Sequence, residues 1–340
     1  MIGRVVGKYK ILDQIGEGGM GVVYRAEHVV LGSPAAIKVL LPQFTRDQVV
    51  LDRFFMEAKA SSAIRHVGVV DVFDFGRLPN DQAYIAMELL RGEALSELLA
   101  RMGPLSGPLA TEITAQTLAA LNATHAVGVI HRDLKPDNIF LTRDVGAPGG
   151  IRVKVLDFGI AKLITEDLGH KAKTKSGSIL GTPAYMSPEQ CKGGVEIDGR
   201  ADLYALGCIL YQMLVGTPPY VADGGGEVMA MQIYQPPPRL PPHLGELDGL
   251  LGKLLAKRPD ERMPSAAYAL AAIERIGVPA LTAEVPLANT EPVRPSLNTE
   301  MLDLQVDAPG LPTWVPVTVI LFALALAGAA VYVIGFSGLL

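Results

Sequence analysis

The chain has few cysteines and no pattern that would use them. Only Cys191 and Cys208 occur among its 340 residues, and they do not form a Cys-x-x-Cys pair. Two widely spaced cysteines make neither a zinc site nor a disulfide framework. We therefore expect reduced thiols in a cytosolic domain.

An excess of positive charge is also missing, since the formal net charge is −5 at pH 7. That sign gives no reason to expect a nucleic-acid partner. The first residues, MIGRVVGKYKILDQIGEGG, lack the long apolar run of a secretory signal peptide, and no internal repeat is present. With 49% hydrophobic residues, the chain can bury a sizeable core in one large domain or two smaller ones.

One long apolar run is present near the C-terminus. Residues 317–336 read VTVILFALALAGAAVYVIGF, which is 20 residues without a charge. As a helix this run would span about 30 Å, the thickness of the hydrocarbon layer. A buried core helix is the alternative, but the run is apolar on all sides and follows a Pro-rich, acidic stretch. We predict a transmembrane helix over 314–337, preceded by a juxtamembrane linker over 276–313.

Residues 9–90 and the residues after them have different patterns. The first part alternates apolar and polar residues in short runs and predicts strands, with one helix about 47–64. Helical periodicity dominates from Leu95 onward. Strands followed by helices predict an α+β protein with two lobes. The predicted strands are 9–16, 21–28, 35–40, 69–76 and 83–89, and the predicted helices after them are 95–102, 109–128, 202–216 and 247–258.

A glycine-rich stretch, IGEGGMGVVY, places Gly16, Gly18 and Gly21 in a G-x-G-x-x-G pattern. Glycines let the backbone approach a phosphate closely and present N–H groups to it. Alone the pattern is weak, because a glycine-rich hairpin has the same string. A dinucleotide-binding domain needs a helix directly after the glycines, and the strand-like GVVYRAEH stands there instead.

Lys38 lies in the middle of an apolar strand, AAIKVL. Burying its ammonium is costly without a partner. The ordinary interpretation is an edge-strand lysine that faces water. A partner is available in Glu57, which lies in the helical segment RFFMEAKAS and can face Lys38 from that helix.

The stretch VIHRDLKPDNIF crowds charged and amide groups between apolar residues. A charged surface turn would explain Asp133, Lys135 and Asn138 equally well. A second stretch, VKVLDFGIAK, places Asp157 on a turn directly after a strand. Asn138 and Asp157 offer the oxygen ligands that Mg²⁺ takes together with phosphate oxygens.

These motifs, in this order, match the signature of the protein kinases. The chain resembles the bacterial serine/threonine kinases of eukaryotic (Hanks) type, and the segments GTPAYMSPEQ and DLYALGCILYQMLVGTPPY share that likeness. The resemblance covers residues 9–275. It implies the two-lobed protein kinase fold, with a β-rich N-terminal lobe over 9–90 and a helical C-terminal lobe over 91–275.

The resemblance also implies roles for the charged residues. Asp133 would orient the substrate hydroxyl and accept its proton, and Lys135 would neutralise the transferring phosphoryl group. Asn138 and Asp157 would hold Mg²⁺ or Mn²⁺, and Lys38, positioned by Glu57, would contact the phosphates of ATP. The residues expected to form the ATP site are Ile15, Gly16, Glu17, Gly18, Gly19, Gly21, Val23, Ala36, Lys38, Glu57, Glu88, Leu90 and Phe140.

Supporting roles follow from the same resemblance. Asp202 is expected to bind the backbone of the 131–133 loop, and Glu189 to form a buried ion pair with Arg262. Arg132 is expected to pair with a phosphate on the activation segment, 160–187. The candidate phosphorylation sites there are Thr174, Ser176 and Ser178.

The sequence thus predicts an ATP-dependent serine/threonine kinase that phosphorylates proteins and itself. The alternative is a membrane-tethered pseudokinase scaffold, although the charged catalytic groups are all present. A small-molecule phosphotransferase is disfavoured by GTPAYMSPEQ, which resembles a platform for protein substrates. We expect a single span in the inner (plasma) membrane, with the kinase on the cytoplasmic side. Small residues in ALALAGAAV permit a homodimer through the span.

Overall fold

The computed structural model describes residues 1–18, 20–157, 183–193, 197–276, 281 and 285–288. The predicted span over 314–337 and the candidate sites Thr174, Ser176 and Ser178 lie outside these residues. Within the described ranges, no helix combines the length and apolar character needed to cross a membrane.

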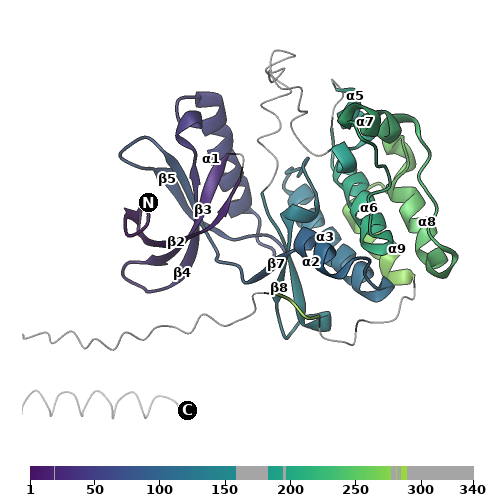
Figure 1. Cartoon of the computed structure of the whole chain (residues 1–340), viewed down its shortest axis with the longest axis horizontal. Coiled ribbons are helices and arrows are strands. Elements are labelled where there is room, and N and C mark those ends of the chain that lie inside the picture. Colours follow the sequence, from purple (N-terminus) through teal and green to yellow (C-terminus); the bar gives the residue numbers. More distant parts are fainter. Residues whose placement is uncertain (19, 158–182, 194–196, 277–280, 282–284, 289–340) are drawn as a thin grey trace, which may run out of the picture. The chain divides into compact units, whose positions relative to one another are not determined.

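The N-terminal lobe is a six-stranded antiparallel sheet with one helix (Figure 1). Helix α1 (Gln48–Ala63) begins after Asp47, whose carboxylate accepts hydrogen bonds from the N–H groups of Val49 and Val50. The strand order is β1-β2-β3-β4-β6-β5. The strands are β1 (Val5–Val6), β2 (Tyr9–Glu17), β3 (Gly21–His28), β4 (Pro34–Leu40), β5 (Val72–Arg77) and β6 (Ala83–Met87).

Strand β4 lies inside this sheet, between β3 and β6. From Ala35 to Leu40 every residue is buried except Lys38, which is partly exposed. A strand with neighbours on both sides has no free edge, so the edge-strand interpretation of Lys38 does not hold. The lysine is therefore held in a nearly continuous apolar strand and must find its partners above the sheet.

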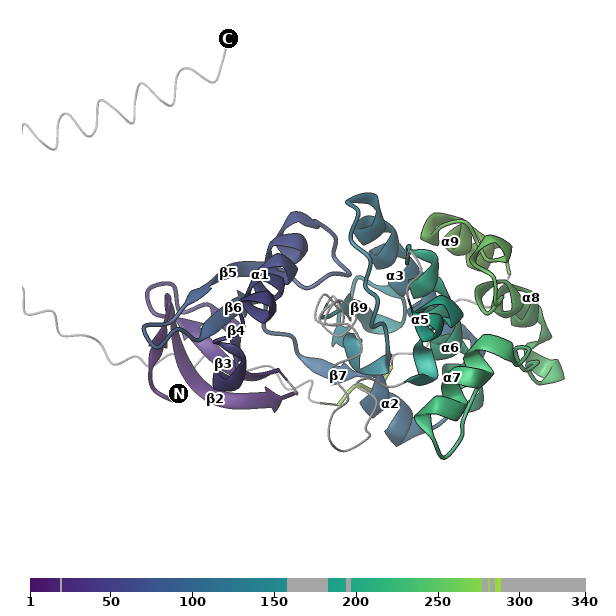
Figure 2. The same cartoon turned by 90° about the horizontal axis from the view of Figure 1, so that it is seen from above.

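The C-terminal lobe is built from helices and a small antiparallel sheet of order β7-β8-β9. In the turned view of Figure 2, this small sheet lies on the side of the C-terminal lobe that is nearer the N-terminal lobe. The strands are β7 (Gly92–Ala94), β8 (Ile139–Arg143) and β9 (Ile151–Val155). The helices are α2 (Leu95–Met102), α3 (Gly107–Ala126), α5 (Pro188–Lys192), α6 (Arg200–Val215), α7 (Gly225–Tyr234), α8 (Gly245–Leu254) and α9 (Ala266–Arg275).

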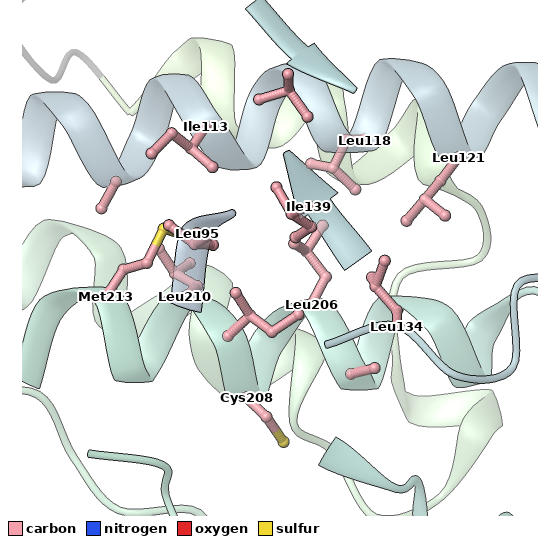
Figure 3. Close-up of a cluster of buried hydrophobic side chains, with 14 of the residues drawn as sticks. Leu95, Ile113, Leu118, Leu121, Leu134, Ile139, Leu206, Cys208, Leu210 and Met213 are labelled. Carbon is pink, nitrogen blue, oxygen red and sulfur yellow. The ribbon is translucent and has the colours of Figure 1, made fainter. Parts of the chain in front are cut away.

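Helix α6 forms the centre of this lobe. All ten residues from Ala201 to Leu210 are buried, and Figure 3 shows Leu206, Leu210 and Met213 packed toward α3 and β8. Gly207 permits close contact with α8, because a Cβ there would lie 2.9 Å from Cβ of Leu254. A helix buried on all sides gives the loops around it a rigid support.

A short segment beyond α9 also packs on this lobe. Val285 and Leu287 are only 3% and 7% exposed and join the large apolar core. Arg101 donates a hydrogen bond to the Pro286 carbonyl, and the N–H of Ala288 donates to the Glu93 carboxylate. Part of the stretch predicted as linker is thus built into the domain (Figure 1).

The predicted two-lobed α+β architecture is confirmed. The five predicted strands of the N-terminal lobe and the helix about 47–64 are all present. Their ends differ from the predicted ones by no more than three residues. The strand predicted before Asp157 is present as β9, whereas helices α5, α7 and α9 and strands β1, β7 and β8 were not predicted.

Candidate active site

The glycine-rich stretch is the turn between β2 and β3. The N–H of Gly18 donates to the Gly21 carbonyl at 2.9 Å and closes the turn. A Cβ at Gly21 would lie 2.7 Å from the Val39 carbonyl oxygen, so the close approach of β4 requires glycine there. A Cβ at Gly18 would meet no heavy atom within 4 Å, so this side of the turn is open to a ligand. Gly19 lies outside the described residues.

Lys38 reaches two carboxylates that come from different lobes. Its Nζ lies 2.7 Å from Oδ1 of Asp157 and 3.9 Å from Oε1 of Glu57. Asp157 directly follows the β9 end of the small sheet, and Glu57 lies on α1. The Lys38 and Glu57 side chains are 16% and 14% exposed, whereas Asp157 is 54% exposed. The predicted meeting of Lys38 with Glu57 is present, and Asp157 is its nearer partner.

The ionisation of this triad follows from burial and charge. Burial disfavours the Lys38 ammonium, but the Asp157 and Glu57 carboxylates outweigh it and raise the pKa of Lys38. Partial burial, on the side that faces Lys38, acts to raise the pKa of Asp157, but the Lys38 ammonium more than offsets it, so that pKa is lowered. For Glu57 burial dominates and raises the pKa to about 7. Near neutral pH, Glu57 is therefore the member of the triad that titrates.

The loop from His131 to Asn138 brings the other predicted residues together. Nδ2 of Asn138 donates to the Asp133 carbonyl at 2.8 Å, and the N–H of Leu156 donates to the Asn138 carbonyl at 2.9 Å. The Lys135 ammonium lies 3.4 Å from Oδ2 of Asp133. Asn138 is thus joined both to the loop of Asp133 and to the residue before Asp157.

The residues fit a divalent cation by the chemistry of their free atoms. Because Nδ2 of Asn138 is bound to a carbonyl, Oδ1 is the atom of that amide that remains for a cation. Asp157 uses Oδ1 for Lys38, and among the residues that the structure describes Oδ2 has no recorded partner. Its φ of 44° lies in the left-handed region, which is strained for a residue with a side chain and sets the direction of the carboxylate.

Asp202 of α6 fixes the start of this loop. Its Oδ2 accepts from the N–H of His131 and its Oδ1 from the N–H of Arg132, both at 2.8 Å. Arg132 has a φ of 61°, so this left-handed turn is held by the buried carboxylate. The predicted role of Asp202 is confirmed. Sequence reasoning gave His125 no role, yet its Nε2 lies 2.7 Å from Oδ2 of Asp202.

Glu189 and Arg262 form the predicted buried ion pair. Two parallel N–H···O bonds of 2.7 Å join them, and the side chains are 7% and 0% exposed. Beside this ion pair, Nε2 of Gln190 donates to the Arg132 carbonyl at 2.7 Å and joins α5 to the loop from His131 to Asn138. Ser187 caps α5 with its hydroxyl, which accepts from the N–H of Gln190.

A small pocket opens between the catalytic loop and the turn that precedes α5. That 3₁₀ turn is Pro183–Tyr185, and its last residue contributes to the pocket wall. Asp133 and Lys135 line the same pocket. The residues around the pocket are Arg132, Asp133, Leu134, Lys135, Tyr185, Met186 and Gln190.

Three apolar residues expected in the ATP site come from both sheets. Ala36 pairs with Met87 and is 6% exposed, and Val23 pairs with Lys38. Phe140 pairs with Ala94 in the small sheet.

Glu88 lies at the connection between the lobes. Its carboxylate pairs with Lys154 and with the N–H of Asp71, and its own N–H donates to the Asp71 carbonyl. Both contacts of the carboxylate use Oε1, and the main-chain carbonyl of Glu88 is an acceptor at the position where the hinge is expected to meet a nucleotide base. Leu90 is half-buried, whereas Ile15 and Glu17 are exposed on β2.

Comparison with known proteins places this site in context. The family model described as protein kinase domain matches residues 9–272. The serine/threonine-protein kinase Pkn1 of Myxococcus xanthus is 40% identical over 318 residues, which are 92% of this chain and 44% of that protein. The serine/threonine-protein kinase PknH of Mycobacterium tuberculosis is 37% identical over 283 residues, 82% of this chain and 43% of that protein. The chain thus spans about half the length of these relatives.

A solved structure agrees. The crystal structure of the PknI kinase domain of Mycobacterium tuberculosis is similar with a TM-score of 0.63 and 29% identity. The match covers 82% of this chain and 99% of that chain.

Proposed function

The chain belongs to the protein kinase domain family, and from that premise we propose that it is an active serine/threonine kinase of the bacterial Hanks type. It transfers the γ-phosphoryl group of ATP to serine and threonine hydroxyls of proteins. The observation that carries the proposal is the convergence of four groups. Lys38 is paired with Asp157, and Asn138 is bound to the loop of Asp133.

Phosphoryl transfer needs placement and charge neutralisation more than covalent help. The Asp133 carboxylate orients the acceptor hydroxyl and takes its proton. Lys135, 3.4 Å from it, is near enough to stabilise charge on the transferred group. Lys38 contacts the phosphates, and the glycine-rich turn covers them with backbone N–H groups. Asn138 and Asp157 would hold Mg²⁺, which would supply neutralisation of the phosphate charge when bound.

The pseudokinase scaffold is the second candidate. A scaffold does not need these charged groups. Here Lys38 contacts both Asp157 and Glu57, and the proposed metal ligands Asn138 and Asp157 are both present. The test is incubation of the purified full chain with γ-labelled ATP, Mg²⁺ and myelin basic protein as a general acceptor. Phosphoserine or phosphothreonine in the acceptor supports the kinase. Nucleotide binding without incorporation supports the scaffold.

We also propose how the kinase is placed and controlled. The uncharged run over 317–336 anchors the chain in the inner membrane with a single span, and the kinase lies on the cytoplasmic side where ATP is available. Small residues in that run allow a homodimer. Autophosphorylation of Thr174 or Ser176 activates the domain, because a phosphate there can pair with Arg132.

A further inference from the structure

Lys257 is a partly buried cation held by neutral groups. It follows α8, and its Nζ donates to the Gln232 carbonyl at 2.7 Å, the Tyr220 hydroxyl at 2.9 Å and the Tyr204 hydroxyl at 3.1 Å. The ammonium also lies 4.3 Å from the centre of the Tyr220 ring. In the described part of the chain, no carboxylate forms an ion pair with Lys257.

This arrangement costs stability. Burial lowers the pKa of Lys257 to about 8, and Arg262 acts in the same direction, while the thiols of Cys208 and Cys191 oppose them. A charged group with a lowered pKa makes the folded state less stable at neutral pH than a neutral group of the same shape would. The presence of Lys257 therefore needs a reason other than stability.

The contacts of Lys257 lead to the end of α7. The Gln232 carbonyl lies in the last turn of that helix, where carbonyl groups lack the usual partner within the helix, and the Met231 carbonyl, which Lys257 also contacts, already accepts from the N–H of Gln235. A cation there satisfies them and interacts favourably with the negative end of the helix dipole. Lys257 thus fixes the turn of α7 that carries the Gln232 side chain.

The Gln232 side chain binds the 3₁₀ turn Pro183–Tyr185. It is fully buried, and its Nε2 donates to the Ala184 carbonyl at 2.8 Å and to the Pro183 carbonyl at 3.2 Å. Its Oε1 accepts from the Tyr204 hydroxyl, which is itself bound by Lys257. The next residue, Tyr185, lines the pocket that contains Asp133.

We propose that Lys257 is a positioning residue for the acceptor protein. Through Gln232, its charge holds the turn Pro183–Tyr185 beside Asp133, so that binding of the acceptor depends on Lys257 and binding of ATP does not. This inference rests on the proposed kinase function. It adds Lys257 as a determinant of acceptor binding that acts through the turn Pro183–Tyr185 and does not touch the reacting groups.

The first test compares Lys257→Met with Lys253→Met, an exposed lysine on α8. Both phenols keep an acceptor in Lys257→Met, since Tyr204 donates to Gln232 and Tyr220 to the Gln235 carbonyl. The variant should therefore fold, with a Tm no lower than that of the wild type. Its KM for myelin basic protein should rise about tenfold, the change that about 1.4 kcal/mol of lost positioning produces. The KM for ATP should stay within twofold, and Lys253→Met should match the wild type.

The coupling can be measured from the other end. Gln232→Met removes the two bonds to the turn without touching the Lys257 ammonium. If both residues act on the same turn, the double variant should raise the acceptor KM no further than the more affected single variant. Independent, multiplying effects would overturn the proposal.

Titration of the wild type provides a readout that does not depend on a variant's folding. As pH rises from 7 to 9, Lys257 loses its charge and the acceptor KM should rise, while Lys257→Arg should show no such rise. An acceptor KM that is flat in the wild type, or that rises equally in both proteins, rejects the role of Lys257. If the wild type transfers no phosphate at all, it is the kinase proposal that fails, and the two results are thus distinguishable.

Discussion

Lys38 and Asp157 meet across the two lobes at 2.7 Å, and Lys38 is the shared partner of a strand, a helix and the turn after β9. One ammonium thus links the phosphate site to a metal ligand. Removing it leaves the two carboxylates of Asp157 and Glu57 with no cation between them. Replacing Lys38 should therefore disturb the charges of the site more than replacing any other residue, and it removes no apolar side chain from the core.

The first prediction concerns this lysine and the proposed base. Lys38→Met and Asp133→Asn should each lower the rate of phosphoryl transfer by at least about 10²-fold, because each group acts on charge that develops in the transition state. Transfer of γ-label from ATP to myelin basic protein measures the rate, and circular dichroism checks the fold. Lys10→Met, an exposed lysine on β2, is the control. A normal rate in either site variant would remove that residue from the mechanism.

The second prediction concerns the pH dependence of the Glu57 pair. Since burial raises the pKa of Glu57 to about 7, the carboxyl group loses its proton between about pH 6 and 8. Ionised Glu57 can hold Lys38 in place for the phosphates, so the KM for ATP should fall as pH rises through this range. Glu57→Gln should have a higher KM with little pH dependence below pH 8. A wild-type profile that matches Glu57→Gln would contradict the assignment.

The raised pKa of Glu57 also affects the stability of the folded domain. Stability should fall as pH rises, whereas ATP binding should improve. A carboxyl group whose pKa is raised from 4.5 in the unfolded chain binds its proton more tightly in the folded state. Its contribution to stability is therefore present below pH 4.5 and is lost as pH rises to about 7. The Tm of the wild type, measured against that of Glu57→Gln, should decline from pH 5 to pH 7.5. A difference that is constant with pH would show that the group does not titrate there.

The sequence predicted those parts of the site that depend on local pattern. Lys38 is conspicuous because a charge interrupts an apolar strand, and Asp133 because several charges share one short loop. Partners that come from far along the chain gave no such signal. The contact of His125 with Asp202 joins residues 77 positions apart, and Lys257 meets Gln232 only because the loop after α8 lies against the end of α7.

The same reasoning explains the missed elements. Helix α7 follows a run of glycines, GGGEVMAMQIY, which lowers helix propensity at its start and hides the periodicity. The strand-like β7 has three residues, too few for an alternating pattern. Composition predicted a linker where Val285 and Leu287 are buried, because burial of two residues in a Pro-rich stretch is decided by the surface that receives them.

The third prediction tests whether this segment is part of the domain. Leu287→Ala removes a side chain that is 7% exposed and packed in the main core, and should destabilise the domain by about 2 kcal/mol or more. Leu31→Ala makes the same change at a side chain that is 75% exposed and should cost about 0.5 kcal/mol or less. Chemical denaturation of the full chain measures both. Equal stability of the two variants would mean that the segment does not pack in solution.

The fourth prediction concerns the activation segment, whose candidate sites lie outside the described residues. Mass spectrometry of active protein should find phosphate on Thr174 or Ser176. Each phosphate adds about −1.5 to −2 charges, and Arg132, whose backbone is held by Asp202, is the expected partner. The double variant Thr174→Ala, Ser176→Ala should lose most of its activity. Full activity in that variant would reject the switch.

The fifth prediction concerns membrane anchoring. The run over 317–336 carries no charge over 20 residues, which favours insertion into a bilayer. The full chain should therefore sediment with membranes and need detergent for release, whereas a chain that lacks residues 314–340 should stay in the supernatant with its kinase activity intact.

The positive-inside rule gives no help, since no Lys or Arg follows Arg294. The side of the membrane needs its own measurement. Protease added outside intact cells should leave the kinase domain whole, because the proposed topology puts the domain on the cytoplasmic side with ATP. Digestion of the domain, or a full chain that is soluble without detergent, would show that this topology is wrong.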